Sequence, residues 1–218
     1  MRKLNNVLLI SLTLLLIATA ALAGSSVCVK FERSKVLGTG PLPYNYRIID
    51  GRIHAGGHPL GPTNDLGNTD QQALSILDYL RSKGVVTVID LENTGRIEAR
   101  YERLLKIAGL KLLHIPMSMT KVPDQTEWRR IRVAMEKPVY IHCKWGVDRT
   151  GAVIAKYLIE EKGYSIDEAI KAVEKNGSHA GVMGGIKKVY VIDPVYRKFW
   201  ERQDPVIPKP KFQTAMAY

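Results

Sequence analysis

Residues that hold metals or cross-link a chain are scarce in this sequence. It contains two cysteines, Cys28 and Cys143, and five histidines scattered along 218 residues. A metal site needs several such ligands close together, so we expect no metal and no other cofactor. The sequence also lacks internal repeats and any stripe of arginines interleaved with aromatic residues. Because no nucleic-acid-binding module is recognisable either, we expect no nucleic-acid partner.

Acidic residues are also few in comparison with basic ones. The chain has 21 aspartates and glutamates against 32 lysines and arginines, which gives a formal net charge of +11. A basic surface attracts anions, so phosphorylated molecules and anionic lipid headgroups at a membrane surface are the favoured partners. A soluble basic protein without such a partner would show the same balance, and that alternative stays open.

Long apolar runs are absent except at the N-terminus. The chain starts with a basic segment, continues through an apolar stretch over residues 7–20, and reaches a small-residue cleavage pattern that ends at Ala23. This order is typical of a signal peptide, so we expect residues 1–23 to be removed and the protein to be exported, periplasmic or secreted. Removal takes away Arg2 and Lys3 and leaves a net charge of +9. The alternative is an N-terminal membrane anchor, because residues 7–23 are just long enough to span a bilayer.

Beyond residue 23, hydrophobic periodicity alternates between strand and helix. We expect an irregular leader over 24–43, one catalytic domain over 44–200 and a flexible basic tail over 201–218. The pattern predicts strands within 48–55, 84–91, 111–115 and 138–141, and helices over 69–83, 96–108, 124–136, 165–177 and from Thr150 onward; residues 189–200 form a helix or an extended segment. Such alternation predicts an α/β fold with a central, mostly parallel sheet flanked by helices. Its ligand site should lie beyond the carboxyl ends of the strands.

The stretch from His142 to Gly151 carries the clearest chemical signal. Five residues separate Cys143 from Arg149, and the stretch joins a predicted strand to a predicted helix. Backbone N–H groups converge in such a loop and the helix dipole adds positive potential, so the loop can bind a phosphate and favour a thiolate. We therefore predict Cys143 as the nucleophile of a cysteinyl-phosphate intermediate and Arg149 as the clamp on the phosphate oxygens. The substrate cradle is predicted from the adjoining residues: His142, Lys144, Trp145, Gly146 and Val147.

The same stretch resembles the Cys-x5-Arg-Ser/Thr signature of the protein tyrosine phosphatase superfamily, in its dual-specificity-like branch, with Thr150 following the arginine. Residues 48–59, 84–91 and 112–117 are similar to the family's opening strand pair, its first central strand and the strand before its general-acid loop. The resemblance implies a monomeric, metal-independent phosphatase. In it, Thr150 donates a hydrogen bond to the Cys143 sulfur and His142 supports the thiolate indirectly. A rhodanese-like sulfurtransferase would have a loop one residue shorter, and an arsenate reductase would need further thiols.

Two aspartates are candidates for the general acid that protonates the leaving group. Asp124 lies on the loop where the family places its acid, although it is also a natural helix N-cap with Glu127 three residues on. Asp148 lies inside the loop beside Arg149, where some phosphoinositide phosphatases carry a similar aspartate. We favour Asp124 slightly and keep both as predictions.

The substrate class stays open at this level. A phosphotyrosine or phosphoserine/threonine protein is the first candidate. Lys144, directly after the cysteine, also suits an inositol phosphate or phosphoinositide, and a non-catalytic phosphate-binding pseudophosphatase is the third possibility. Export would expose the thiol to oxidants, and a disulfide between Cys28 and Cys143 would silence the enzyme. A free Cys28 is the favoured interpretation.

Overall fold

The computed structural model describes residues 28–61, 67–93, 95, 97–118, 121–179 and 193–201. The expected signal peptide lies outside the described residues, and so does the expected tail apart from Glu201. Within these described segments, every helix is too short or too polar to cross a lipid bilayer.

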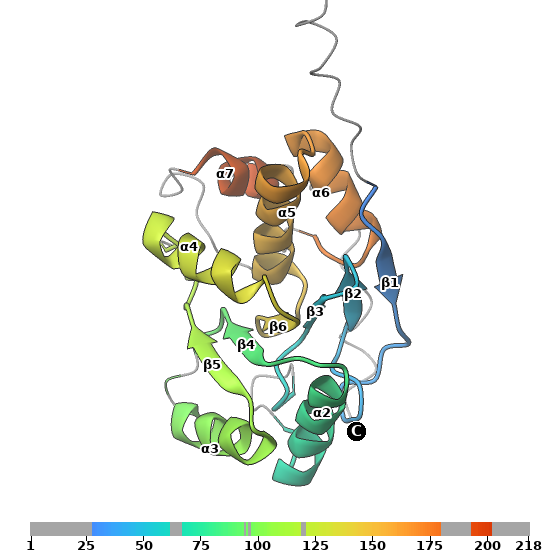
Figure 1. Cartoon of the computed structure of the whole chain (residues 1–218), viewed down its shortest axis with the longest axis vertical. Helices are drawn as coiled ribbons and strands as arrows, with labels where there is room; N and C mark the ends of the chain where they lie inside the picture. Colours follow the sequence, from blue (N-terminus) through green and yellow to red (C-terminus); the bar gives the residue numbers. More distant parts are fainter. Residues whose placement is uncertain are drawn as a thin grey trace, which may run out of the picture.

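Six strands form one sheet in the order β1-β2-β3-β6-β4-β5 (Figure 1). Strands β3, β6, β4 and β5 run parallel to one another, whereas β1 and β2 extend the sheet in antiparallel fashion. The central part of the sheet is therefore parallel, as the alternation of strands and helices predicts. The strands are β1 Phe31–Arg33, β2 Arg47–Ile49, β3 Ile53–Gly56, β4 Thr87–Asp90, β5 Lys111–His114 and β6 Val139–His142.

The expectation of an irregular leader is wrong at one place. Residues 31–33 form β1, which pairs with β2. Three residues are too short a run for periodicity to reveal a strand, and only the partner strand supplies the hydrogen bonds that make it one.

Helices cover both faces of the sheet, and their bounds agree with the predicted ones to within a few residues. Three of them begin with capping boxes at Thr69, Asp124 and Ser165, where the cap side chain and the side chain three residues on each accept a backbone N–H. The segment left open over 189–200 contains a helix. The described helices are α2 Asp70–Ser82, α3 Glu98–Ala108, α4 Gln125–Ala134, α5 Asp148–Lys162, α6 Ile166–Lys175 and α7 Pro194–Glu201.

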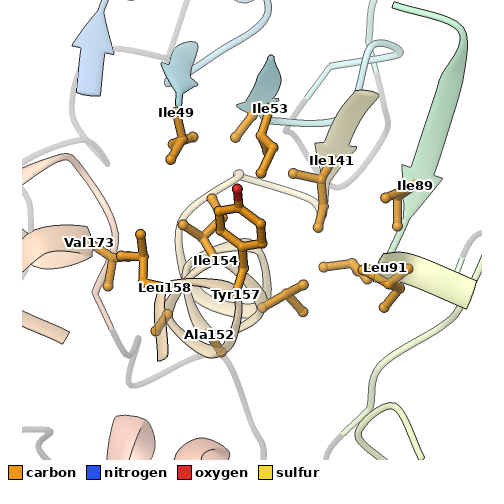
Figure 2. Packing of buried hydrophobic residues seen from close by; sticks show 14 of the residues in the cluster. Ile49, Ile53, Ile89, Leu91, Ile141, Ala152, Ile154, Tyr157, Leu158 and Val173 are labelled. Carbon is orange, nitrogen blue, oxygen red and sulfur yellow. The ribbon is translucent and has the colours of Figure 1, made fainter. Parts of the chain in front are cut away.

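Two hydrophobic clusters, one on each face, position the centre of the sheet. Alternate residues of β6 point to opposite faces, so Ile141 packs in the cluster that contains α5, and Tyr140 in the cluster that contains α2 and α3. Figure 2 shows sheet residues such as Ile49 and Ile53 meeting Ile154 and other apolar side chains of α5. Helix α5 also packs against α6 and α7 and is therefore buried over most of its length. Strand β6 and α5 thus form a rigid support for the loop between them.

Candidate active site

The loop between β6 and α5 is held by the chain segment that follows β3. Cys143 begins the loop and is 2% exposed. The carbonyl oxygen of Lys144 accepts a hydrogen bond from the backbone N–H of His58 at 3.0 Å. Gly146 has a φ of +67° and lies directly on the backbone of Gly56 and Gly57, where a β-carbon would overlap them. Only glycine fits this approach, which sets the shape of the cradle.

Asn45 ties the other side of the loop to the rest of the domain. Its side-chain Nδ2 donates to the carbonyl oxygen of Gly146 at 3.1 Å and to that of Gly177 at 2.8 Å. Asn45 is 5% exposed and adopts a φ of 53°, a left-handed conformation that asparagine tolerates better than most residues. The sequence alone does not reveal Asn45 as a site residue, because an asparagine before a strand carries no signal for a contact about a hundred positions away.

Helix α5 points its N-terminus at the loop. Val147 is its N-cap residue and makes no capping hydrogen bond through its side chain. The first N–H groups of the helix therefore receive no hydrogen bond from the N-cap side chain, and the helix dipole places partial positive charge at this end. This arrangement suits an anion bound between Cys143 and Arg149.

Arg149 is held in position by Glu92 and two backbone carbonyls. Its Nη2 donates to Glu92 Oε2 in an ion pair, and its Nη1 donates to the carbonyl oxygens of Leu91 and Met117 at 3.3 Å each. Burial alone would lower the pKa of Arg149, but the charges of Cys143 and Glu92 outweigh it and leave the pKa raised, so the guanidinium stays charged. Glu92 is a site residue that sequence reasoning missed. Its place just after β4, at the carboxyl edge of the sheet, is the signal that points to it.

His142 is fully buried behind the loop. Its Nε2 lies 2.9 Å from the hydroxyl oxygen of Tyr101, and its Nδ1 lies 3.4 Å from the carbonyl oxygen of Cys143. Burial holds the pKa of His142 well below its ordinary value, so the ring is neutral. A neutral, anchored imidazole can support the loop through hydrogen bonds, which is the indirect role expected for it.

The structure does not contain the expected hydrogen bond from Thr150 to the Cys143 sulfur. Thr150 Oγ1 is buried and has no hydrogen-bond partner among the described residues. The expected bond belongs to the step in which the sulfur departs from phosphorus. The role of Thr150 in that step therefore stays a prediction.

The two candidate acids occupy different environments. Asp124 is exposed and caps α4, its Oδ1 accepting the backbone N–H of Glu127 at 2.8 Å. Asp148 is 8% exposed, and its Oδ1 accepts the indole N–H of Trp200 at 2.6 Å, which ties the first turn of α5 to α7. Each aspartate therefore also has a structural role. The choice between them as general acid stays a prediction.

Trp145 and Lys144 stand on the more open side of the loop. The Trp145 side chain is 37% exposed, and its ring meets the ring of Tyr44 edge to face at 5.4 Å. Lys144 and Val147 are half-buried. An exposed aromatic ring beside the cradle can contact the part of a substrate that carries the phosphate.

One group of buried side chains among the described residues has the residue types of a metal site but lacks a free nitrogen lone pair on one of its histidines. His58, Asp90 and His142 bring potential ligand atoms within 4.8 Å of one another. However, His58 Nδ1 accepts the backbone N–H of Leu60 at 3.0 Å, which leaves the proton on Nε2. A protonated ring nitrogen cannot ligate a cation, so these residues do not fit a metal.

Cys143 and Cys28 are both free thiols, the first buried and the second exposed. The interpretation of Cys28 as an unpaired cysteine therefore agrees with the structure.

This α/β fold, with its cysteine–arginine loop between a central parallel strand and a buried helix, is similar to the fold of solved phosphatases, as the sequence predicts. Residues 67–163 match the family model described as "Polymorphic toxin system, DSP-PTPase phosphatase". The predicted similarity to the protein tyrosine phosphatase superfamily, in its dual-specificity-like branch, is confirmed.

Known proteins share this similarity over different lengths. Phosphatidylglycerophosphatase and protein-tyrosine phosphatase 1 of Mus musculus is 31% identical over 107 residues, which are 46% of this chain and 55% of that protein. The chain thus spans about half the length of the curated relatives it matches first. Among solved structures, TpbA of P. aeruginosa has a TM-score of 0.52 at 21% identity, covering 78% of this chain and 96% of TpbA. The core catalytic domain of the PP-IP phosphatase SIW14 from S. cerevisiae has a TM-score of 0.50 at 17% identity, covering 78% of this chain and 89% of that domain's chain.

Proposed function

We propose that this protein is an exported phosphatase that hydrolyses phosphate monoesters through a cysteinyl-phosphate intermediate. The observation that carries the proposal is the loop that joins β6 to α5: Cys143 lies in it, just before the N-terminus of α5, and Glu92 holds the guanidinium of Arg149. Cys143 is close enough to this guanidinium for its charge to raise the pKa of Arg149. Convergent N–H groups and a fixed arginine stabilise a phosphoryl group in the transition state more than they stabilise a neutral ligand.

The chemistry runs in two displacements. The Cys143 thiolate attacks phosphorus, and an S–P bond forms while the bond between phosphorus and the leaving oxygen breaks. Asp124 or Asp148 gives its proton to that oxygen. Water then attacks phosphorus with the same carboxylate as base, and the S–P bond breaks to release phosphate and the thiolate. Arg149 and the loop N–H groups hold the equatorial oxygens throughout.

The favoured substrates are proteins that carry phosphotyrosine or phosphoserine/threonine. The alternative substrate is a phosphorylated lipid or inositol. The name of the mouse relative joins a phosphatidylglycerophosphatase to a protein-tyrosine phosphatase, and this supports the alternative. Activity on short phosphopeptides and on vesicles that contain a phosphoinositide, measured as released phosphate, ranks the two classes.

Export is part of the proposal and rests on the N-terminal sequence pattern. N-terminal sequencing of protein recovered from the cell envelope or medium should begin near Gly24. Recovery of the intact N-terminus in the membrane fraction would favour the anchor instead.

The central test is the hydrolysis of p-nitrophenyl phosphate with EDTA and a reductant present. We expect turnover by the wild type and none by Cys143→Ser. Cys28→Ser is the matched control, because it removes the other, exposed thiol and should keep full activity. A folded, reduced wild type without turnover would refute the proposal and favour a phosphate-binding pseudophosphatase.

A second comparison decides between the two acids. Replacing the true acid by asparagine should reduce kcat far more for an alkyl phosphate than for p-nitrophenyl phosphate, because the p-nitrophenolate leaving group needs little protonation. Ser165→Ala removes an equivalent capping box from α6 and shows what the loss of a cap alone does. Equal, small losses in Asp124→Asn and Asp148→Asn would exclude both residues.

A further inference from the structure

Arg47, in strand β2, is a charged residue buried beside the cradle, and the chemistry described above leaves it unused. Its relative exposure is 0%, and its side chain is among the largest fully buried ones in the described residues. In the sheet it pairs with Ala55 of β3, which pairs in turn with Ile141 of β6. Paired residues share a face, and residues two apart on a strand share one too. Arg47 therefore lies on the α5 side of the sheet, the same side as Cys143.

Within the part of the chain that the structure describes, two hydrogen bonds hold its guanidinium. Nη1 donates to the carbonyl oxygen of Asn45 at 3.0 Å, and Nη2 donates to Ser178 Oγ at 2.7 Å. Both acceptors are neutral, and no ion pair involves Arg47 within the described residues. A buried guanidinium without a carboxylate is costly, so an anion elsewhere should offset its charge.

The acceptors of Arg47 also touch the cradle. Asn45 donates to the carbonyl oxygen of Gly146 inside the loop. Ser178 packs against Gly151 in the first turn of α5, its Oγ 2.7 Å from where a β-carbon on Gly151 would lie. The guanidinium therefore lies beneath the loop and near the positive end of the α5 dipole. A cation at this end of a helix is unfavourable unless an anion binds there.

The electrostatics of the surroundings agree with this position. Burial lowers the pKa of Arg47 to about 10, while the charges of Cys143 and Tyr140 act in the opposite direction and Arg33 adds to the lowering. Arg47 is thus still charged at neutral pH. Several other charged or titratable groups lie around the loop. Among the described residues they include Lys144 within it, Arg149 and Asp148 from α5, Asp90 and Glu92 at the end of β4, His142 from β6, His58 after β3, and Arg33 from β1.

We propose that Arg47 is a positioning residue that supplies a second buried positive charge to the cradle from beneath. It stabilises the Cys143 thiolate and the bound phosphoryl group, while Arg149 binds the phosphate oxygens directly. The effect of Arg47 on the bound phosphoryl group rests on the proposed function, because it requires that the protein hydrolyses phosphate esters. Its effect on the thiolate does not require turnover, so the two can fail separately.

The experiment measures the rate at which iodoacetamide alkylates Cys143 between pH 4 and 9, in a Cys28→Ser background so that one thiol reacts. Arg47→Gln removes the charge and keeps a side chain that can hydrogen-bond. We expect its alkylation midpoint to move to higher pH by about one unit, the effect of a charge roughly 10 Å away in a partly screened interior. The acid limb of kcat/KM for p-nitrophenyl phosphate should move with it.

Matched variants separate charge from packing. Arg47→Lys keeps the charge and should restore most of the wild-type midpoint, and Ser178→Ala removes one hydrogen bond but leaves the midpoint in place. Should Arg47→Gln fail to fold, Arg47→Met is the second neutral variant, because buried charges are often replaced by apolar residues without loss of stability. A folded neutral variant with the wild-type midpoint would overturn the proposal. A shifted midpoint in a protein that hydrolyses no phosphate ester would keep it and refute the proposed function.

Discussion

Substitution of Gly146 by alanine tests how tightly the cradle is shaped by its neighbours. The substitution has two costs. The φ of +67° is unfavourable for alanine by about 1–2 kcal/mol. In addition, the new β-carbon would overlap the Gly56 carbonyl group and approach the Gly57 nitrogen to 2.6 Å, so the loop must move away by roughly 1 Å. A displacement of this size in a catalytic group can lower activity about 100-fold.

The chain contains a matched control at the other end of the same helix. Gly163 has a φ of +71°, and a β-carbon there would meet no atom within 4 Å. Gly163→Ala therefore carries the conformational cost without the collision. In a domain of this size, 1–2 kcal/mol lowers the melting temperature by about 2–8 °C.

The assay is kcat/KM for p-nitrophenyl phosphate beside thermal unfolding. We expect Gly163→Ala to melt earlier with unchanged kcat/KM, and Gly146→Ala to lose about two orders of magnitude in kcat/KM. Equal kcat/KM in the two variants would refute the reasoning that contact with Gly56 and Gly57 shapes the loop.

Three further changes should have separate signatures. Glu92→Gln removes the charge that orients Arg149, and kcat/KM should fall about tenfold, the loss of a charge-assisted hydrogen bond; an unchanged value would mean that the two backbone carbonyls suffice. Trp200→Phe leaves the buried Asp148 carboxylate without its indole donor, and urea unfolding should show a loss of about 1–3 kcal/mol; wild-type stability would contradict this. Burial lowers the pKa of His58 from 6.5 to about 3, so between these pH values the unfolded chain takes up a second ring proton there and the folded chain does not. Stability therefore falls as pH drops from about 6.5 toward 3, and His58→Gln should flatten that fall by up to 1.4 kcal/mol per pH unit; an equally steep fall in the variant would show that this ring is not responsible.

The elements of the fold were predictable where local signals were strong. Capping boxes at Thr69, Asp124 and Ser165 mark helix starts through contacts three residues apart, and the structure contains all three. The short antiparallel strand at the edge of the sheet could not be predicted from local signals. Strand β1 exists because β2 lies beside it, and no pattern within residues 31–33 distinguishes it from an irregular leader.

Cys143 and Arg149 could be identified from the chain alone because the loop that joins them is continuous, so spacing and flanking periodicity place both side chains. Their supports come from distant positions: Glu92 is 57 residues from Arg149, Asn45 is 101 residues from Gly146, and Arg47 is 131 residues from Ser178. Contacts at such separations depend on strand order and register, which follow from the packing of whole elements and not from local preference. Local chemistry therefore specified the nucleophile and its clamp, whereas the pairing of β2 with β3 and of β3 with β6 decided which charges surround them.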